Sequence, residues 1–469
     1  MYRMQLCTVE GPRYHLSGYK ALRDTDLQTQ LVDGTTLHAT LYHGPDAASP
    51  VLARGRLSAS VASFAKQLST IRVLGAHAPE PRITAIARAG LFLAGPLFEI
   101  YGGVVSEELP HHAGSPRKKR PLRVPPPDLH AVQTVDGRTL RLTRYRCGAK
   151  GPVLLLPGLG TSSLIFATDT VDTNLVEYLG EHGYDVWLLD PRTSTALPTA
   201  NQPANADDVA TQDYPAAVAD VLRITGAESV QIVAHCFGAT TVLMSLLSEA
   251  GLPGVRSLVL SQGAADIVVP ITAELKAGLH MPGVLEELGL STLSADPGPG
   301  WADRVFDRIA ALQPAAIVDH DTNPVSRRIT FLYGKQFQRR HLGRLTYDCG
   351  LREIFGVASL AALEHQATLV RAGHLVDAQG REAYMGRIHD RLCLPIAFIH
   401  GCENKCILPE SSERTYRRLT ERYGPHSYSR HVLPGYGHLD CILGKDAVRD
   451  VYPLVVAALD AHATHKGAG

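Results

Sequence analysis

The stretch Ala234-His235-Cys236-Phe237-Gly238-Ala239 decides how this chain folds. The apolar run at residues 229–234 predicts a short buried strand, and residues 240–247 predict a buried helix. A strand, a sharp turn with a reactive residue at its apex, small residues and a helix together form a nucleophile elbow. Such an elbow strains one residue so that its side chain stands free above a parallel sheet. We therefore predict that Cys236 is a nucleophile, at a position where serine is more usual.

A loop that follows another buried strand supports this interpretation. It reads Leu154-Leu-Leu-Pro-Gly-Leu-Gly160. In an elbow enzyme this loop supplies one backbone N–H group of the oxyanion hole, and the residue after the nucleophile supplies the other. The two donors are then Leu159 and Phe237. The alternative is a dinucleotide-binding loop, but Ser163 stands where its third glycine belongs, and no convincing acidic ribose partner follows.

A histidine in a late loop is the candidate base. It lies in Gly435-Tyr-Gly-His438-Leu-Asp440, just before the last predicted helix. From there it can reach across the top of the sheet, deprotonate the thiol and reprotonate a leaving group. A chain order of nucleophile, acid, histidine also fits elbow enzymes. The alternative is a capping or surface histidine.

The orienting acid belongs in the loop after the predicted strand at 394–400, which reads Gly401-Cys-Glu-Asn-Lys-Cys406. Both Glu403 and Asn404 qualify by position. A carboxylate stabilises an imidazolium ion, whereas an amide only orients the ring, so Glu403 is favoured and Asn404 stays open. A cysteine nucleophile needs less help than serine, because it can pair as a thiolate with an imidazolium.

Cysteines beside this loop also raise the possibility of a metal site. Cys402, Cys406 and Cys441 lie near His400 and His438 in the sequence, but the Cys-x-x-x-Cys spacing is poor support for a metal site, and the catalytic residues claim the same loop. We predict no metal and no cofactor.

The arrangement of predicted elements favours an α/β fold with three parts. Residues 1–110 form a small α+β accessory domain, residues 111–128 a basic, proline-rich linker that is extended and exposed, and residues 129–469 the catalytic domain. A mostly helical lid is inserted at about 264–391. Alternating strands and helices in the third part predict a mostly parallel sheet covered by helices on both faces.

The individual elements follow from hydrophobic periodicity. In the accessory domain we expect strands at 35–42 and 51–57 and a helix at 61–74. In the catalytic domain we expect a hairpin at 130–146 that turns at Asp136-Gly137, strands at 153–156, 184–189 and 257–261, and helices at 172–182, 213–225 (with Asp213 as N-cap) and 447–461.

These motifs together resemble the α/β-hydrolase superfamily. The resemblance covers residue 129 to the C-terminus and rests on Pro157-Gly158, the elbow, the loop at 400–409 and Gly437-His438. Closer similarity is to the hydrolase-type domains that accompany bacterial cholesterol-oxidase-like (GMC) flavoproteins. The phrases Gly401-Cys-Glu-Asn-Lys-Cys-Ile-Leu-Pro-Glu410, Pro434-Gly-Tyr-Gly-His-Leu-Asp-Cys441 and Phe64-Ala-Lys-Gln-Leu68 carry it. The chain also resembles, more loosely, polyhydroxyalkanoate synthases and depolymerases and dienelactone hydrolases, which use an elbow cysteine. Ala234 replaces the usual first glycine, and Asn404 stands where many relatives carry an aspartate.

The composition indicates which partners and which cellular compartment to expect. Lys+Arg and Asp+Glu both number 46 among 469 residues, so nothing points to nucleic acid as a partner. The N-terminus lacks an apolar signal core, no apolar run reaches membrane length, and eight scattered cysteines suit a reducing compartment. We expect a soluble cytoplasmic protein. The sequence does not indicate its oligomeric state.

The leading hypothesis is acyl chemistry through a Cys236 thioester on a hydrophobic ester, lactone or thioester, by hydrolysis or acyl transfer. The apolar lid residues Leu342, Leu345, Phe355 and Leu360 suggest the hydrophobic substrate. The alternative is non-hydrolytic use of the same Cys236 and His438, as a cyclase, lyase or carbon–carbon bond-forming enzyme on a polycyclic or polyketide-like substrate. A binding module without activity is a third reading, which the presence of nucleophile, oxyanion loop and histidine together disfavours.

Overall fold

The computed structural model describes residues 2–7, 13–19, 36–58, 117–278, 291–296 and 323–463. The chain divides into two compact units, one of residues 1–72 with 271–279 and one of residues 73–270 with 280–469. Each is described by itself. The helix predicted at 61–74 lies outside the described residues, and the proposed domain boundaries stay predictions.

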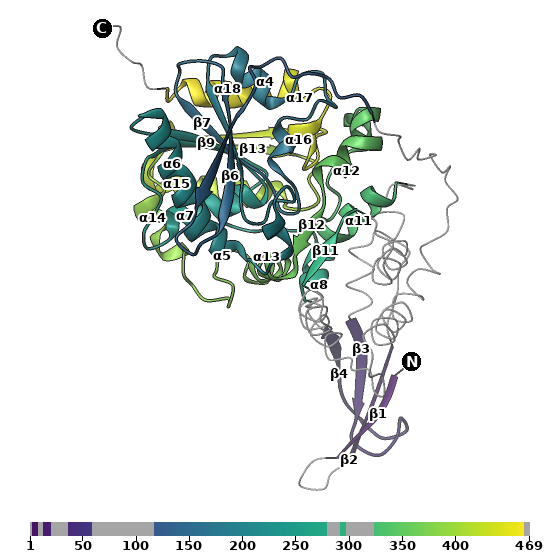
Figure 1. Cartoon of the computed structure of the whole chain (residues 1–469). Coiled ribbons are helices and arrows are strands. Elements are labelled where there is room, and N and C mark those ends of the chain that lie inside the picture. The colour runs from purple at the N-terminus through teal and green to yellow at the C-terminus, as the bar shows by residue number, and fades with distance from the viewer. Residues whose placement is uncertain are drawn as a thin grey trace. The chain divides into compact units, whose positions relative to one another are not determined.

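The first unit contains a four-stranded antiparallel sheet in which consecutive strands are neighbours (Figure 1). Its strands are β1 (Tyr2–Cys7), β2 (Arg13–Tyr19), β3 (Thr36–Tyr42) and β4 (Val51–Ser58), and the unit includes helix α8 (Ile271–Gly278). The strands predicted at 35–42 and 51–57 are confirmed as β3 and β4.

The second unit is built on an eight-stranded sheet with the order β14-β13-β10-β9-β7-β8-β6-β5. The strands are β5 (Asp128–Gln133), β6 (Thr139–Arg146), β7 (Pro152–Leu156), β8 (Asp185–Asp190), β9 (Val230–His235), β10 (Val255–Ser261), β13 (Ile396–Gly401) and β14 (Tyr428–Leu433). All neighbours from β14 to β8 are parallel, and β6 and β5 add an antiparallel edge. This confirms the predicted α/β fold with a mostly parallel sheet.

Helices cover both faces of this sheet (Figure 1). One face carries α4 (Leu175–Glu181), α16 (Asp440–Leu443), α17 (Ala447–Asp450) and α18 (Tyr452–Asp460). The other carries α5 (Ala206–Asp208), α6 (Tyr214–Thr225), α7 (Phe237–Leu247) and α15 (Pro409–Tyr423). Strand β7 is fully buried, with Val153 and Leu155 in one core and Leu154 and Leu156 in the other. A strand buried on both faces reads as a continuous apolar run.

One predicted helix start needs correction, and one predicted cap lacks its side-chain hydrogen bond. Helix α4 begins at Leu175, three residues after the predicted start, because Asn174 caps it: its side chain accepts from the Glu177 N–H, and the Glu177 carboxylate accepts from the Asn174 N–H. Asp213 occupies the N-cap position of α6 (Tyr214–Thr225) as predicted, but its side chain does not cap the helix: its backbone is already helical, and its carboxylate accepts from Arg192 Nε at 2.7 Å.

Two features near the C-terminus also differ from the prediction. The closing helix is broken at Val451 into α17 and α18, where Pro453 lies in the first turn of α18 and has no N–H to continue a helix. Strand β14 was not predicted, because this edge strand is mostly half-buried and its sequence Tyr-Ser-Arg-His-Val-Leu lacks an apolar run.

The insertion between β10 and β13 contributes the lid. Besides α8, its described elements are β11 (Thr292–Ser294), α11 (Pro324–Tyr333), α12 (Leu351–Ile354), β12 (Val357–Ser359), α13 (Leu360–Ala372) and α14 (Ile388–Arg391). Backbone hydrogen bonds join the lid directly to the loop after β7: Ser162 N–H donates to Ile354 O at 3.3 Å, and Gly356 N–H donates to Gly160 O at 3.1 Å. Within the described ranges, no helix is both long and apolar enough to cross a membrane.

The described part of the linker corrects the expectation of a solvated charge run. Arg117 forms paired hydrogen bonds with Asp169, at 2.7 Å each, and with Glu353 of α12, at 2.8 and 2.9 Å. Arg120 binds the fully buried Glu177 at 2.6 Å. Fork-shaped Arg–carboxylate pairs of this kind are geometrically specific. The described part of the linker is thus held to the eight-stranded sheet's unit by its own basic residues.

We expect Gly238→Ala to destabilise the second unit, although alanine favours a helix over glycine. A Cβ at residue 238 would lie 2.6 Å from Pro157 O and 2.7 Å from Leu156 O. The clash should lower the free energy of unfolding by about 1–3 kcal/mol, measured by urea denaturation. Gly386→Ala is the matched control, because its Cβ meets nothing within 4 Å. Equal stability of the two variants would contradict the close approach at the elbow.

Candidate active site

Cys236 adopts the backbone conformation of an elbow. Its φ of 56° and ψ of −118° follow directly on β9, and α7 begins at the next residue. A non-glycine residue in such a conformation costs about 1–3 kcal/mol and persists only where its surroundings enforce it. Because Gly238 has no Cβ, α7 can pack directly against the backbone of Leu156 and Pro157. The predicted elbow is thus present, with Cys236 at its apex.

The predicted oxyanion loop lies against this cysteine. The backbone N–H groups of Leu159 and Phe237 both interact with the thiol and favour its thiolate form. A Cβ added at Gly158 would lie 3.4 Å from the Cβ of Cys236. Two N–H donors that converge on one point can stabilise a negative charge that develops there.

The thiol and the histidine are both held neutral. Cys236 keeps some accessible surface, but many protein atoms surround its thiol, and burial raises its pKa to about 12 despite the two N–H groups. Burial, with smaller contributions from His235 and His400, lowers the pKa of the fully buried His438 well below its usual value. The structure therefore favours a neutral thiol and imidazole over the ion pair expected from the sequence.

Asn404 is the candidate that the structure brings to His438. Its Nδ2 lies 3.0 Å from His438 Nδ1, and both side chains are fully buried. Glu403, the favoured acid, instead forms an ion pair with Arg340 at 2.9 Å, and its side chain is 39% exposed. The structure does not bring Glu403 to the histidine, because the two adjacent side chains leave the loop in different directions.

The neighbours of Asn404 determine which way its amide points. Its Oδ1 accepts hydrogen bonds from the backbone N–H groups of Cys406 at 2.8 Å and Ile407 at 3.2 Å. Its NH₂ group therefore faces Gln262 Oε1 at 2.9 Å and His438 Nδ1. Because an amide NH₂ can only donate, Nδ1 must accept, and neutral His438 carries its proton on Nε2. That Nε2 has no hydrogen-bond partner among the described residues.

Gln262 is a site residue that sequence reasoning missed. It follows β10, has a φ of 60° and is fully buried. Its Oε1 accepts from the Gly401 N–H at 3.1 Å, and its Nε2 lies 2.9 Å from Cys441 Sγ. Gln262 therefore fixes the loop that carries Asn404. Its place directly after a buried strand was the only signal in the sequence.

Tyr333, the last residue of α11, was also missed. Its Oη exposes less than 1 Å² and has no hydrogen-bond partner among the described residues. A Cβ at Gly160 would lie 1.8 Å from this oxygen. Burial, together with a smaller electrostatic interaction with Cys236, raises the pKa of the phenol. A buried hydroxyl without a partner costs about 1–3 kcal/mol, so this one calls for an explanation.

His235 supports the site from within the sheet. Its ring lies edge-on to that of His438 with 5.0 Å between centroids, and its Nδ1 lies 3.2 Å from Ser261 Oγ. Burial lowers the pKa of His235 to about 3, so it stays neutral. Because His235 directly precedes Cys236, this ring contact places His438 beside the elbow.

Two of the three cysteines considered as metal ligands, Cys406 and Cys441, have protein partners, whereas Cys402 is exposed. Cys406 Sγ lies 3.0 Å from Gln336 Nε2, and Cys441 Sγ lies close to Gln262. Among the described residues, no group of three or more His, Cys, Asp or Glu side chains is placed to hold a metal ion.

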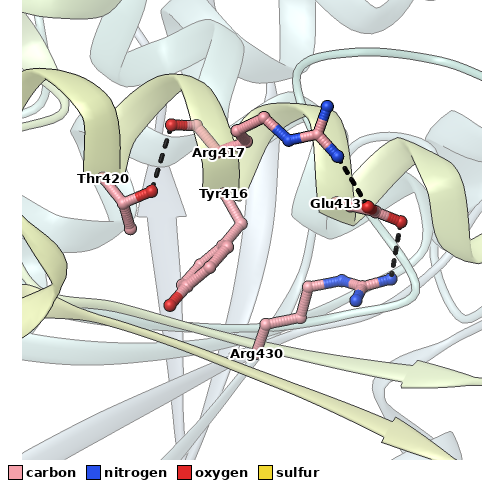
Figure 2. Close-up of a pocket in the computed structure, with 5 residues that line it drawn as sticks. All are labelled: Glu413, Tyr416, Arg417, Thr420 and Arg430. Carbon is pink, nitrogen blue, oxygen red and sulfur yellow. Dashed lines mark hydrogen bonds and ion pairs between the residues drawn. The ribbon is translucent and has the colours of Figure 1, made fainter.

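A surface hollow lies apart from these residues, between α15 and β14 (Figure 2). It is lined by Glu413, Tyr416, Arg417, Thr420 and Arg430. Glu413 pairs with Arg417 at 2.7 Å and with Arg430 at 3.9 Å, so both arginines of the hollow already have a carboxylate partner within it. None of the elbow or histidine-loop residues lines it.

Comparison with known proteins agrees with this geometry. The sequence model of the alpha/beta hydrolase fold family matches residues 151–445, and the chain belongs to that family.

Individual relatives are more distant. Lipase 1 of Drosophila melanogaster is 30% identical over 123 residues, which cover 24% of this chain and 28% of that protein. The lysosomal acid lipase/cholesteryl ester hydrolase of Homo sapiens is 32% identical over 132 residues, 24% of this chain and 33% of that protein. The chain thus spans only about a third of the length of these relatives. Among solved structures, a soluble variant of monoglyceride lipase from Saccharomyces cerevisiae matches 74% of this chain and 98% of that one, with 15% identity and a TM-score of 0.46.

The raised pKa of Cys236 predicts slow alkylation at neutral pH. Only the thiolate reacts with iodoacetamide, and a group with a raised pKa is almost fully protonated at pH 7. The rate at Cys236 should rise about tenfold per pH unit from pH 7 to 10, measured by peptide mass spectrometry. The exposed Cys393 and Cys402 report reagent access in the same sample. A rate at Cys236 that levels off below pH 8 would show an activated thiolate instead.

Proposed function

We propose that this chain is an esterase-type enzyme in which Cys236 forms an acyl thioester with a hydrophobic ester, lactone or thioester. The convergence of the Leu159 and Phe237 N–H groups on the Cys236 thiol carries the proposal. These groups suit a tetrahedral intermediate, in which a carbonyl oxygen gains negative charge while the carbon bonds to sulfur. The lipases among the relatives support an apolar substrate.

The reaction needs one proton to move through His438. The Sγ–H proton passes to Nε2 as Sγ bonds to the carbonyl carbon and the carbonyl π pair moves to oxygen. When the intermediate collapses, the C=O bond forms again, the bond to the leaving group breaks, and the leaving group takes the proton from Nε2. Water or another acceptor then attacks the thioester, which releases an acid or transfers the acyl group.

Asn404 makes this proton transfer harder. Nε2 accepts a proton only in the tautomer that protonates Nδ1, and this tautomer places an N–H against the Asn404 NH₂ group. The hydrogen bond to Asn404, worth about 0.5–1.5 kcal/mol, is lost in that step. Asn404 is therefore a positioning residue that holds His438 away from its role as a base.

The same observation favours a second function. With the proton on Nε2, His438 is a proton donor at rest, and Cys236 is a neutral thiol. A non-hydrolytic enzyme that protonates or deprotonates carbon in a polycyclic or polyketide-like substrate uses such a pair directly. No acyl group then leaves the substrate.

An acylation assay separates the two functions. We expect activated acyl esters of long-chain acids to add one acyl group to the intact protein at Cys236, detected by mass spectrometry. Cys236→Ala should abolish the adduct, and Cys402→Ala, which removes an exposed cysteine, should leave it unchanged. No adduct across a broad panel of esters, lactones and thioesters would refute the acyl-enzyme and leave the second function.

We expect Asn404→Asp to raise the acylation rate at least tenfold. A carboxylate accepts the Nδ1–H, which leaves Nε2 free to accept the thiol proton; the reverse change in serine proteases lowers kcat by about 10⁴-fold. Glu403→Gln is the matched control and should have little effect, because Glu403 pairs with Arg340. The rates are measured by stopped-flow with p-nitrophenyl esters, together with the pH profile. A loss of acylation in Asn404→Asp, with the fold intact by circular dichroism, would instead indicate that the resting tautomer is the active one.

A further inference from the structure

The lid carries a buried hydroxyl that no described residue satisfies. Tyr333 ends α11, and Gly334, with a φ of 89°, turns the chain directly after it. The ring packs near that of Phe355, with centroids 6.0 Å apart. Packing thus holds the ring in place while the Oη has no hydrogen-bond partner within the described part of the chain.

This Oη lies close to the predicted oxyanion loop. It lies 1.8 Å from the place where a Cβ of Gly160 would stand, so only glycine at 160 leaves room for the phenol. Gly160 directly follows Leu159, one of the two N–H donors. Tyr333 and Cys236 also pack against the same hydrophobic core cluster, and the phenol interacts electrostatically with the thiol.

The lid is fixed in register with this loop. The backbone bonds from Ser162 to Ile354 and from Gly356 to Gly160 flank the bridge between Thr161 and Phe355. Because Phe355 packs near Tyr333, the ladder that anchors the lid also locates the phenol. A hydroxyl held this firmly, next to the loop that carries the proposed Leu159 donor and without a partner among the described residues, is in place to bind a substrate atom.

From this arrangement we infer that Tyr333 is a catalytic residue whose O–H is a third donor of the oxyanion hole. It rests on the proposed function. The phenol donates a hydrogen bond to the carbonyl oxygen of the substrate as Cys236 Sγ bonds to the carbon and the π pair moves onto that oxygen. The proton stays on Tyr333, and the Leu159 and Phe237 N–H groups bind the same oxygen. No oxidant, metal or further reactant is needed.

The test measures kcat and the unfolding midpoint for variants of two tyrosines, Tyr333 and Tyr214. Tyr333→Phe removes only the hydroxyl and should lower kcat for acylation by p-nitrophenyl esters by about 100-fold, with KM nearly unchanged. Its unfolding midpoint should stay the same or rise, because the variant loses an unsatisfied buried hydroxyl. Tyr214→Phe is the matched control. The Tyr214 hydroxyl bonds to Thr241 Oγ1 at 2.7 Å, so this variant should lose stability and keep kcat.

The outcomes distinguish failure of this inference from failure of the proposed function on which it rests. If the wild type forms the Cys236 adduct and Tyr333→Phe forms it equally fast, Tyr333 is not an oxyanion donor, and the proposed function stands. A joint loss of kcat and stability in Tyr333→Phe makes the hydroxyl structural and also overturns the inference. If the wild type forms no adduct with any ester, the proposed function fails and the inference fails with it.

Discussion

The strained backbone of Cys236 is the constraint on which the rest of the site depends. The residue holds a positive φ because β9, the loop after β7 and α7 nearly touch around it, and Gly238 permits that approach. The same closeness brings the Leu159 and Phe237 N–H groups to the thiol and surrounds it with protein, which raises its pKa. One geometric feature thus builds the proposed oxyanion hole and also opposes ionisation of the proposed nucleophile. In the proposed reaction, Cys236 therefore loses its proton only as sulfur bonds to the bound substrate.

The parallel sheet brings the other residues of the candidate site to one edge. Strands β14, β13, β10, β9 and β7 are consecutive neighbours, and each ends at the same edge. The loops that follow them carry His438, Asn404, Gln262, Cys236 and Leu159 in the same order. Hydrogen bonds run across three of these loops, from His438 to Asn404 to Gln262. The tautomer of the histidine is therefore set by Asn404, in the loop of the neighbouring strand, and Gln262 supports that loop from one strand further away.

Local motifs made part of this predictable from the sequence. The elbow, the oxyanion loop and the glycine-flanked histidine each depend on a few adjacent residues. In the structure, the loop contacts Cys236, and His438 packs against His235 of the elbow. The choice between Glu403 and Asn404 depends on which of two neighbouring side chains turns inward. Glu403 was favoured because a carboxylate stabilises an imidazolium ion. In the structure, Glu403 instead pairs with Arg340 at the surface, and the buried side chain beside His438 is the amide of Asn404. Tyr333 was beyond prediction, because only the folded lid brings it to Gly160. Strand β14 was missed because an edge strand lacks the apolar run of a central one.

The ladder between the lid and the loop after β7 has a mechanical consequence. Residues 160–162 continue directly from Leu159, and residues 354–356 of the lid bond to them. Any opening that breaks these bonds frees the loop that carries the proposed Leu159 donor. In the proposed enzyme, admission of substrate and completion of the oxyanion hole are thus one event: with the lid displaced, bulk water meets a thiol whose anion-binding donors have come apart.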